Sequence, residues 1–60
     1  MISAYDQIRS YCEEHRSATT GGLLLAFPNL TWNCIEATIA DLVLDDVIRP
    51  LRGYGWVING

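Results

Sequence analysis

Leu30-Thr-Trp-Asn-Cys-Ile-Glu-Ala-Thr-Ile-Ala-Asp-Leu-Val-Leu-Asp-Asp-Val-Ile48 is the stretch that decides how this chain folds. Within it, Ile35, Ile39 and Leu42 follow one another at spacings of four and three residues, which places them on one face of a helix. The acidic pair Asp45-Asp46 ends this periodicity, and the residues after it have strand character. The stretch therefore predicts a helix over residues 32–44 that buries one apolar face against the rest of the chain.

The start and the outer face of this helix also follow from the residues. Thr31 and Asn33 both favour the amino-terminal cap, and Asn33-x-x-Glu36 has the spacing of a reciprocal capping box. The face opposite the apolar stripe is small and sparsely charged: Asn33, Ala37 and Ala40, with Glu36 and Asp41 at its edges. Such a face can lie close against another surface, so the other elements are expected to support this helix.

The length and composition indicate one small domain over residues 1–60. A chain of this size buries only about 60% of the surface that it exposes when unfolded, so tight packing has to stabilise it. Half of the residues are hydrophobic and 18% are charged, which excludes a disordered tail. The net charge is −3 and there is no lysine, so any contact with a nucleic acid has to be local.

The cysteines and the amino-terminal residues indicate the compartment. Cys12 and Cys34 are too few for a disulfide framework. The first residues lack the basic and apolar regions of a signal peptide, and the longest apolar run, residues 23–27, is too short to span a bilayer. We expect a cytoplasmic protein with reduced thiols and no membrane contact.

Two further helices are expected before the central one. Tyr5, Ile8 and Cys12 recur at helical spacing and predict an amphipathic helix over residues 4–15, capped by the residue before it. Thr19 or Thr20 can cap a second helix of about two turns that ends before residue 28. The short apolar run in this segment also fits a buried strand, which is the competing interpretation.

A hairpin is expected at the carboxyl end, with strands over residues 47–51 and 54–58. The tip, Arg52-Gly-Tyr-Gly55, supplies the glycines that a hairpin turn needs. Pro50 cannot donate a hydrogen bond to a neighbouring strand, so the first strand should lie at a sheet edge. The predicted fold class is α+β, mostly α, with three helices followed by a short β-hairpin wing.

This order of elements resembles a winged helix-turn-helix domain of the kind found in small phage or mobile-element regulators. The resemblance rests mainly on Thr20-Gly-Gly-Leu-Leu-Leu-Ala-Phe-Pro-Asn-Leu-Thr31, which is similar to the family's scaffold helix, turn and start of the recognition helix. The resemblance extends over essentially the whole chain. It also includes the apolar spacing of residues 35–42 and the hydrophobic pair Val47-Ile48, which leads into the wing. Asp46 departs from the family's preferred glycine, which implies another geometry at the helix end.

The resemblance implies a sequence-specific, DNA-binding transcriptional regulator that acts through a recognition helix at 31–44 and a wing at 48–58. The helix would lie in a major groove and the wing along the backbone of double-stranded DNA. We expect a homodimer or a cooperative oligomer, because one copy carries only four arginines. The implied DNA-binding residues are Thr31, Asn33 and Ala37 on bases, and Arg49, Arg52, Tyr54, Arg16 and Thr20 on the backbone.

A second interpretation belongs to another class of protein. Glu36 and Asp41 oppose phosphates, so the same helix could form an acidic protein–protein interaction module that binds a basic partner. Trp32, nearer the apolar stripe than the outer face, would then pack in the core or in that interface. For the wing, Arg49 and Arg52 could instead form surface ion pairs with Asp45 or Asp46. Thr31 and Asn33 could act only as caps.

Enzymatic chemistry is not indicated. Cys12, His15 and Cys34 are the only cysteine and histidine residues, and two of them lie three residues apart, so a closed zinc site is not available. The single histidine has no nucleophile in a recognisable motif, and Gly21-Gly22 lacks the lysine of a phosphate loop. We expect no enzyme activity, no metal and no cofactor.

Overall fold

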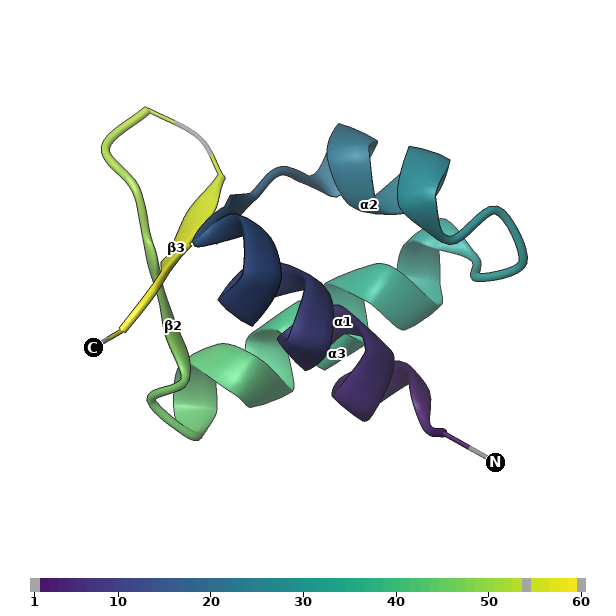
Figure 1. Ribbon diagram of the computed structural model, residues 1–60, viewed down its shortest axis with the longest axis horizontal. Coiled ribbons are helices and arrows are strands. Elements are labelled where there is room, and N and C mark those ends of the chain that lie inside the picture. The colour runs from purple at the N-terminus through teal and green to yellow at the C-terminus, as the bar shows by residue number, and fades with distance from the viewer. Residues whose placement is uncertain (1, 54, 60) are drawn as a thin grey trace.

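The computed structural model describes residues 2–53 and 55–59 of the chain. It is mostly helical, with a small antiparallel sheet beside the helices (Figure 1). The predicted fold class, α+β and mostly α with three helices followed by a hairpin, is confirmed. The elements are α1 (Ala4–His15), β1 (Ser17–Ala18), α2 (Thr20–Ala26), α3 (Trp32–Leu44), β2 (Ile48–Pro50) and β3 (Trp56–Ile58).

Hydroxyl caps begin the two helices that precede α3. The Ser3 side chain accepts a hydrogen bond from the Asp6 N–H at 3.2 Å and starts α1 at the predicted residue. The Thr19 side chain accepts from the Gly22 N–H at 3.0 Å and starts α2. The second segment is therefore the predicted short helix, and the competing interpretation as a strand is wrong.

The central helix α3 has the predicted bounds. Its cap is Thr31, whose side chain accepts from the Cys34 N–H at 3.1 Å. At its other end Asp46 has φ +64°, the left-handed conformation that aspartate tolerates better than most residues. The Asn59 amide donates to the Asp46 carboxylate at 2.9 Å and to its carbonyl at 3.1 Å, which holds this turn. An aspartate thus adopts a conformation that a glycine would reach without strain.

The sheet contains a strand that the sequence did not indicate. Residues 16–20 lie between the first two predicted helices and show no strand pattern, but Ser17–Ala18 pairs antiparallel with β3, and the sheet order is β1-β3-β2. The Ile58 N–H donates to the Arg16 carbonyl at 2.9 Å beside this pairing. A two-residue strand has no periodicity of its own, so only its partner reveals it. β2 lies at the edge, as Pro50 requires, and both hairpin strands are shorter than predicted.

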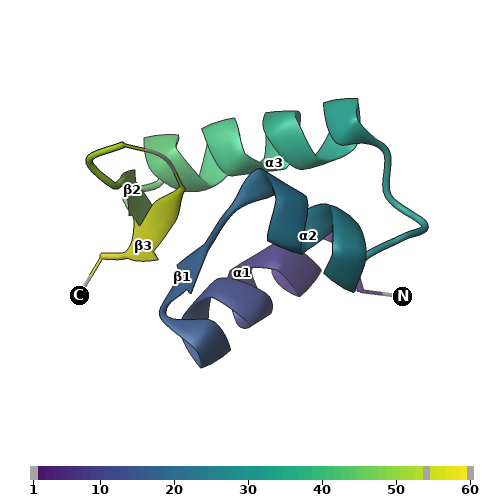
Figure 2. The same ribbon diagram turned by 90° about the horizontal axis from the view of Figure 1, so that it is seen from above.

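The core joins α1, β1, α2, α3 and β2. α3 lies along one side of the molecule, with α1 and α2 packed across its inner face (Figure 2). The predicted stripe of Ile35, Ile39 and Leu42 is buried. Further buried side chains are Ile8, Cys12, Ala18, Leu23, Thr38 and Ile48. This burial fixes the rotation of α3, and hence which of its residues face outward.

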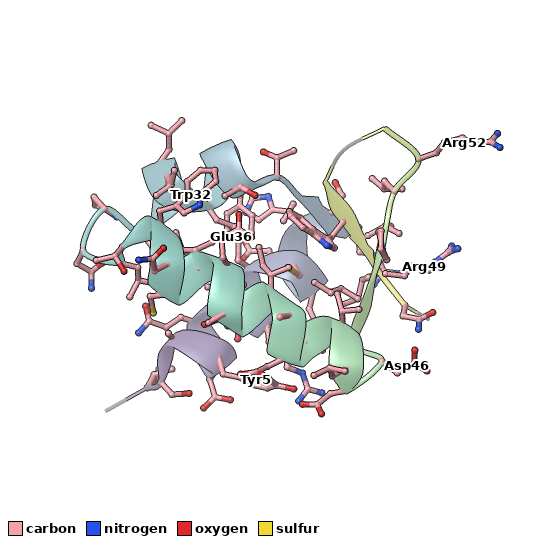
Figure 3. The ribbon with its side chains drawn as sticks, turned by 180° about the vertical axis from the view of Figure 1, so that it is seen from behind. Tyr5, Trp32, Glu36, Asp46, Arg49 and Arg52 are labelled. Carbon is pink, nitrogen blue, oxygen red and sulfur yellow. The ribbon has the colours of Figure 1, made fainter. Side chains whose placement is uncertain are left out.

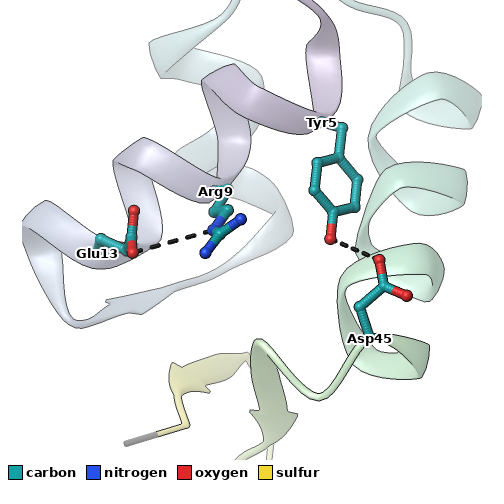
Figure 4. Close-up of polar contacts among 4 residues, drawn as sticks. All are labelled: Tyr5, Arg9, Glu13 and Asp45. Atoms are coloured by element: carbon teal, nitrogen blue, oxygen red, sulfur yellow. Dashed lines mark hydrogen bonds and ion pairs between the residues drawn. The ribbon is translucent and has the colours of Figure 1, made fainter.

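A hydrogen bond between distant residues ties the start of α1 to the end of α3. The Tyr5 hydroxyl donates to the Asp45 carboxylate at 2.6 Å (Figure 4). This hydrogen bond, and to a lesser extent desolvation, raises the pKa of Tyr5.

Among the described residues, no helix has both the length and the apolar character needed to cross a bilayer.

Candidate nucleic-acid interface

The outward side of α3 forms a continuous exposed surface, which we call the α3 face. It is almost free of charge along its centre and acidic at both edges, and no cation occurs anywhere in α3. Leu44, 81% exposed, extends it with an apolar side chain that sequence analysis did not place there. The α3 face consists of Asn33, Ala37, Ala40 and Leu44, bordered by Glu36 and Asp41.

In the amino-terminal turn of α3, Thr31 and Asn33 have different roles, although the sequence allowed either of them to cap the helix. Thr31 is the cap, since its side-chain oxygen accepts from the Cys34 N–H. Asn33 is exposed, and its carboxamide makes no hydrogen bond within the part of the chain that the structure describes. Asn33 is therefore free to present a donor and an acceptor to a ligand, and Ala37 lies one turn further along the same face.

Trp32 does not pack in the core. It is 53% exposed and lies at the end of α3 beside α2 (Figure 3). Leu25, the most exposed large apolar side chain of the described residues, belongs to α2 and is 86% exposed. Packing of Trp32 in the core is therefore excluded, and its role in an interface stays a prediction.

The wing, residues 48–58, carries the basic residues of the site. Arg49 lies in β2 and Arg52 in the hairpin tip, and both are exposed. In the view from the α3 side, both guanidinium groups project from the wing away from α3 (Figure 3). Tyr54, the third predicted wing contact, lies outside the described residues.

The alternative interpretation of the wing arginines, ion pairs with Asp45 or Asp46 at the end of α3, is wrong. Asp45 accepts from the Tyr5 hydroxyl and Asp46 from the Asn59 amide. Among residues 2–53 and 55–59, the one ion pair is between Arg9 and Glu13 of α1, at 3.9 Å (Figure 4). Both wing arginines therefore remain available to an external anion.

Thr20 and Arg16 are the two other residues predicted to contact the DNA backbone, and they lie in different places. Thr20 starts α2 and lines a groove of about 580 Å³ whose other wall is the wing, including Leu51 and Trp56. The turn between α1 and β1, which contains Arg16, lies on the other side of the molecule from α3 (Figure 2). The structure thus brings Thr20 close to the wing and does not bring Arg16 to the same surface.

The candidate metal ligands are not assembled into a site. Cys12 is buried, which raises the pKa of its thiol, whereas Cys34 is half-buried at the start of α3. His15 stacks on Tyr11, with the ring centroids 4.2 Å apart. Within the described residues, no three side chains of histidine, cysteine, aspartate or glutamate lie close enough to hold a metal ion.

No protein-family model, curated protein or solved structure matches this chain. Its function is therefore inferred from its own residues and surfaces. Two of those surfaces stand out: the α3 face, with a free Asn33, and the wing, with two unpaired arginines.

Proposed function

We propose that this chain is a winged helix-turn-helix domain that binds double-stranded DNA and regulates transcription. The observation that carries the proposal is the pair of exposed, unpaired arginines on a hairpin that follows directly from an exposed helix. The carboxylates nearest in sequence, which could have neutralised them, are engaged by Tyr5 and Asn59. A basic wing beside a free helix face is the arrangement that the family resemblance implies.

In this proposal some contacts position the domain on the DNA and others recognise the base sequence. Arg49 and Arg52 bind phosphates and set the register of the domain on the duplex. Asn33 pairs in bidentate fashion with an adenine, and Ala37 contacts a thymine methyl group in the major groove. The Thr31 hydroxyl, which serves the helix as an acceptor, retains its proton for a hydrogen bond to a base edge.

The charge of the chain limits how tightly one copy binds. Two phosphate contacts give a slope of about −2 for the logarithm of the binding constant against the logarithm of salt concentration. The net charge of −3 adds no long-range attraction. Useful affinity therefore requires two or more copies on neighbouring sites, as expected for a dimer or a cooperative array.

A retardation assay on the DNA upstream of the protein's own coding sequence, at low salt, tests the proposal. The variant Arg49→Ala/Arg52→Ala should bind more weakly and flatten the salt slope by about 2. Arg9→Ala is the matched control, because it removes the same residue type from α1, where it pairs with Glu13. Equal losses in the two variants, or no shift by the unmodified protein at low salt, would refute the proposal.

A second candidate function is a protein-interaction module that binds a basic partner through α3. The observation in its favour is the combination of a half-exposed Trp32 with Glu36 and Asp41, neither of which forms an ion pair among the described residues. Exposed aromatic side chains are common anchors of protein interfaces. Glu36→Lys separates the candidates, since it should preserve or strengthen DNA binding but abolish binding to a basic protein.

A further inference from the structure

Two surfaces of this chain carry opposite charges that remain unpaired. α3 carries Glu36 and Asp41 and no cation, whereas residues 48–60 carry Arg49 and Arg52 and no acid. Within residues 2–53 and 55–59, none of these four side chains lies within 4.0 Å of an opposite charge. Each surface therefore lacks the partner that the other could provide.

One copy cannot bring these two surfaces together by itself. The arginines project from the wing away from α3, while the α3 face points out of the molecule on another side (Figure 3). Burial of Ile35, Ile39 and Leu42 fixes the rotation of α3, so its acidic edges cannot turn toward the wing. Any pairing between the surfaces has to occur between two molecules.

The shape of the α3 face suits a narrow hairpin. Glu36 and Asp41 are five residues apart, which places them about 140° apart around the helix axis at 3.6 residues per turn. Ala37 and Ala40 lie between them and are exposed. Because alanine side chains are short, no large side chain protrudes between the two carboxylates. A hairpin lying over the alanines would meet one carboxylate on each side.

We propose that the wing of one copy docks on the α3 face of a second copy, with Arg49 and Arg52 meeting Glu36 and Asp41. The contact joins two different surfaces, so an assembly of two copies keeps one free α3 face on one copy and one free wing on the other, and association continues as an open chain or closes as a ring. This contact requires no DNA and so goes beyond the proposed function. It uses the same arginines, so DNA and a second copy compete for the wing.

The contact is weak and sensitive to salt. Exposed ion pairs contribute little individually and are screened within about 8 Å at physiological ionic strength. The chain exposes 4093 Å², whereas a stable interface covers about 800 Å² on each partner, a large share of so small a surface. Association should therefore appear at low salt and high concentration and disappear at about 1 M salt.

Sedimentation velocity on the whole chain tests the proposal with two charge-reversed variants. Glu36→Arg/Asp41→Arg reverses the α3 face, and Arg49→Glu/Arg52→Glu reverses the wing. Each variant alone should sediment as a monomer, because its two surfaces now carry the same sign. An equimolar mixture should associate again, since the wing of each variant is opposite in charge to the α3 face of the other.

A matched control separates a specific contact from an effect of net charge. Glu13→Arg/Glu14→Arg makes the same change in charge on α1 and should associate like the unmodified protein. Circular dichroism shows whether each variant folds. If a reversed pair does not fold, Glu36→Gln/Asp41→Asn and Arg49→Gln/Arg52→Gln replace it, and each should weaken association at low salt.

Three outcomes would overturn the inference: no association of the unmodified protein at low salt, no recovery in the mixture, or the same loss in the α1 control. The DNA proposal is judged separately by the retardation assay. If the protein is a monomer but shifts DNA through its wing, only the self-association proposal is wrong. If it associates through the wing but shifts no DNA, only the DNA proposal is wrong.

Discussion

Gly55→Ala tests the close approach of the wing to β1. Gly55 has φ +86°, and a Cβ atom built there would lie 2.9 Å from the Ala18 carbonyl oxygen and 3.3 Å from the Thr19 methyl carbon. The first of these contacts is with backbone, so β1 or the wing has to shift to admit the methyl group. Gly53 is the matched control: it has φ +103°, and among the described residues other than its chain neighbours no atom lies within 4 Å of its Cβ position.

The two substitutions should differ by the cost of that clash. A left-handed conformation costs an L-residue about 1–2 kcal/mol, which both variants incur. Forcing an extra methyl group against packed atoms costs about 1–3 kcal/mol more, and only Gly55→Ala incurs it. The total, about 2–5 kcal/mol, is a large part of the roughly 3–9 kcal/mol by which a chain this short is stabilised.

Thermal and urea unfolding, followed by circular dichroism, measure both variants. At about 4–8 °C for each kcal/mol, Gly53→Ala should lower Tm by about 4–16 °C and Gly55→Ala should lower it by clearly more. Equal losses in the two variants would mean that β1 and the wing do not approach each other as described. The pairing of β1 with β3 would then have to be abandoned.

Three further predictions concern the caps, the tyrosine and the thiols. Thr31→Ala removes the cap of α3 and should lower the free energy of unfolding by about 1 kcal/mol in urea titrations. Because its hydrogen bond to Asp45 raises the pKa of Tyr5 above the ordinary 10.0, the stability linked to its proton is complete below pH 10 and is lost as the pH rises through the raised pKa. Unfolding measured on either side of pH 10 should show this loss, and Tyr5→Phe should abolish it. A thiol reagent at neutral pH should modify Cys34 in the folded protein and Cys12 only on unfolding, since Cys12 is 1% exposed and burial raises its pKa; equal rates would contradict this.

The helices could be predicted because their determinants are local. A cap hydroxyl and the donor that it satisfies are three residues apart, as at Ser3 and Thr31, and the apolar stripe of α3 repeats within two turns. The bounds of α1 and α3 therefore follow from neighbouring residues. Pro50 likewise placed β2 at an edge, because a missing N–H excludes a central position whatever the rest of the fold.

The remaining features depend on contacts between residues far apart in the chain, which no local pattern encodes. Ser17–Ala18 is a strand because β3 pairs with it, and Trp32 is exposed because the packing of α3 leaves it at the edge of the core. The wing arginines form no ion pair among the described residues, and the nearby carboxylates bond elsewhere: Asp45 accepts from a tyrosine 40 residues away and Asp46 from an asparagine 13 residues away. The sequence thus determined the helices and the kind of fold through short-range hydrogen bonds and periodic burial. Only the tertiary structure decided which charges stay unpaired at the surface, because such pairing requires distant side chains to meet.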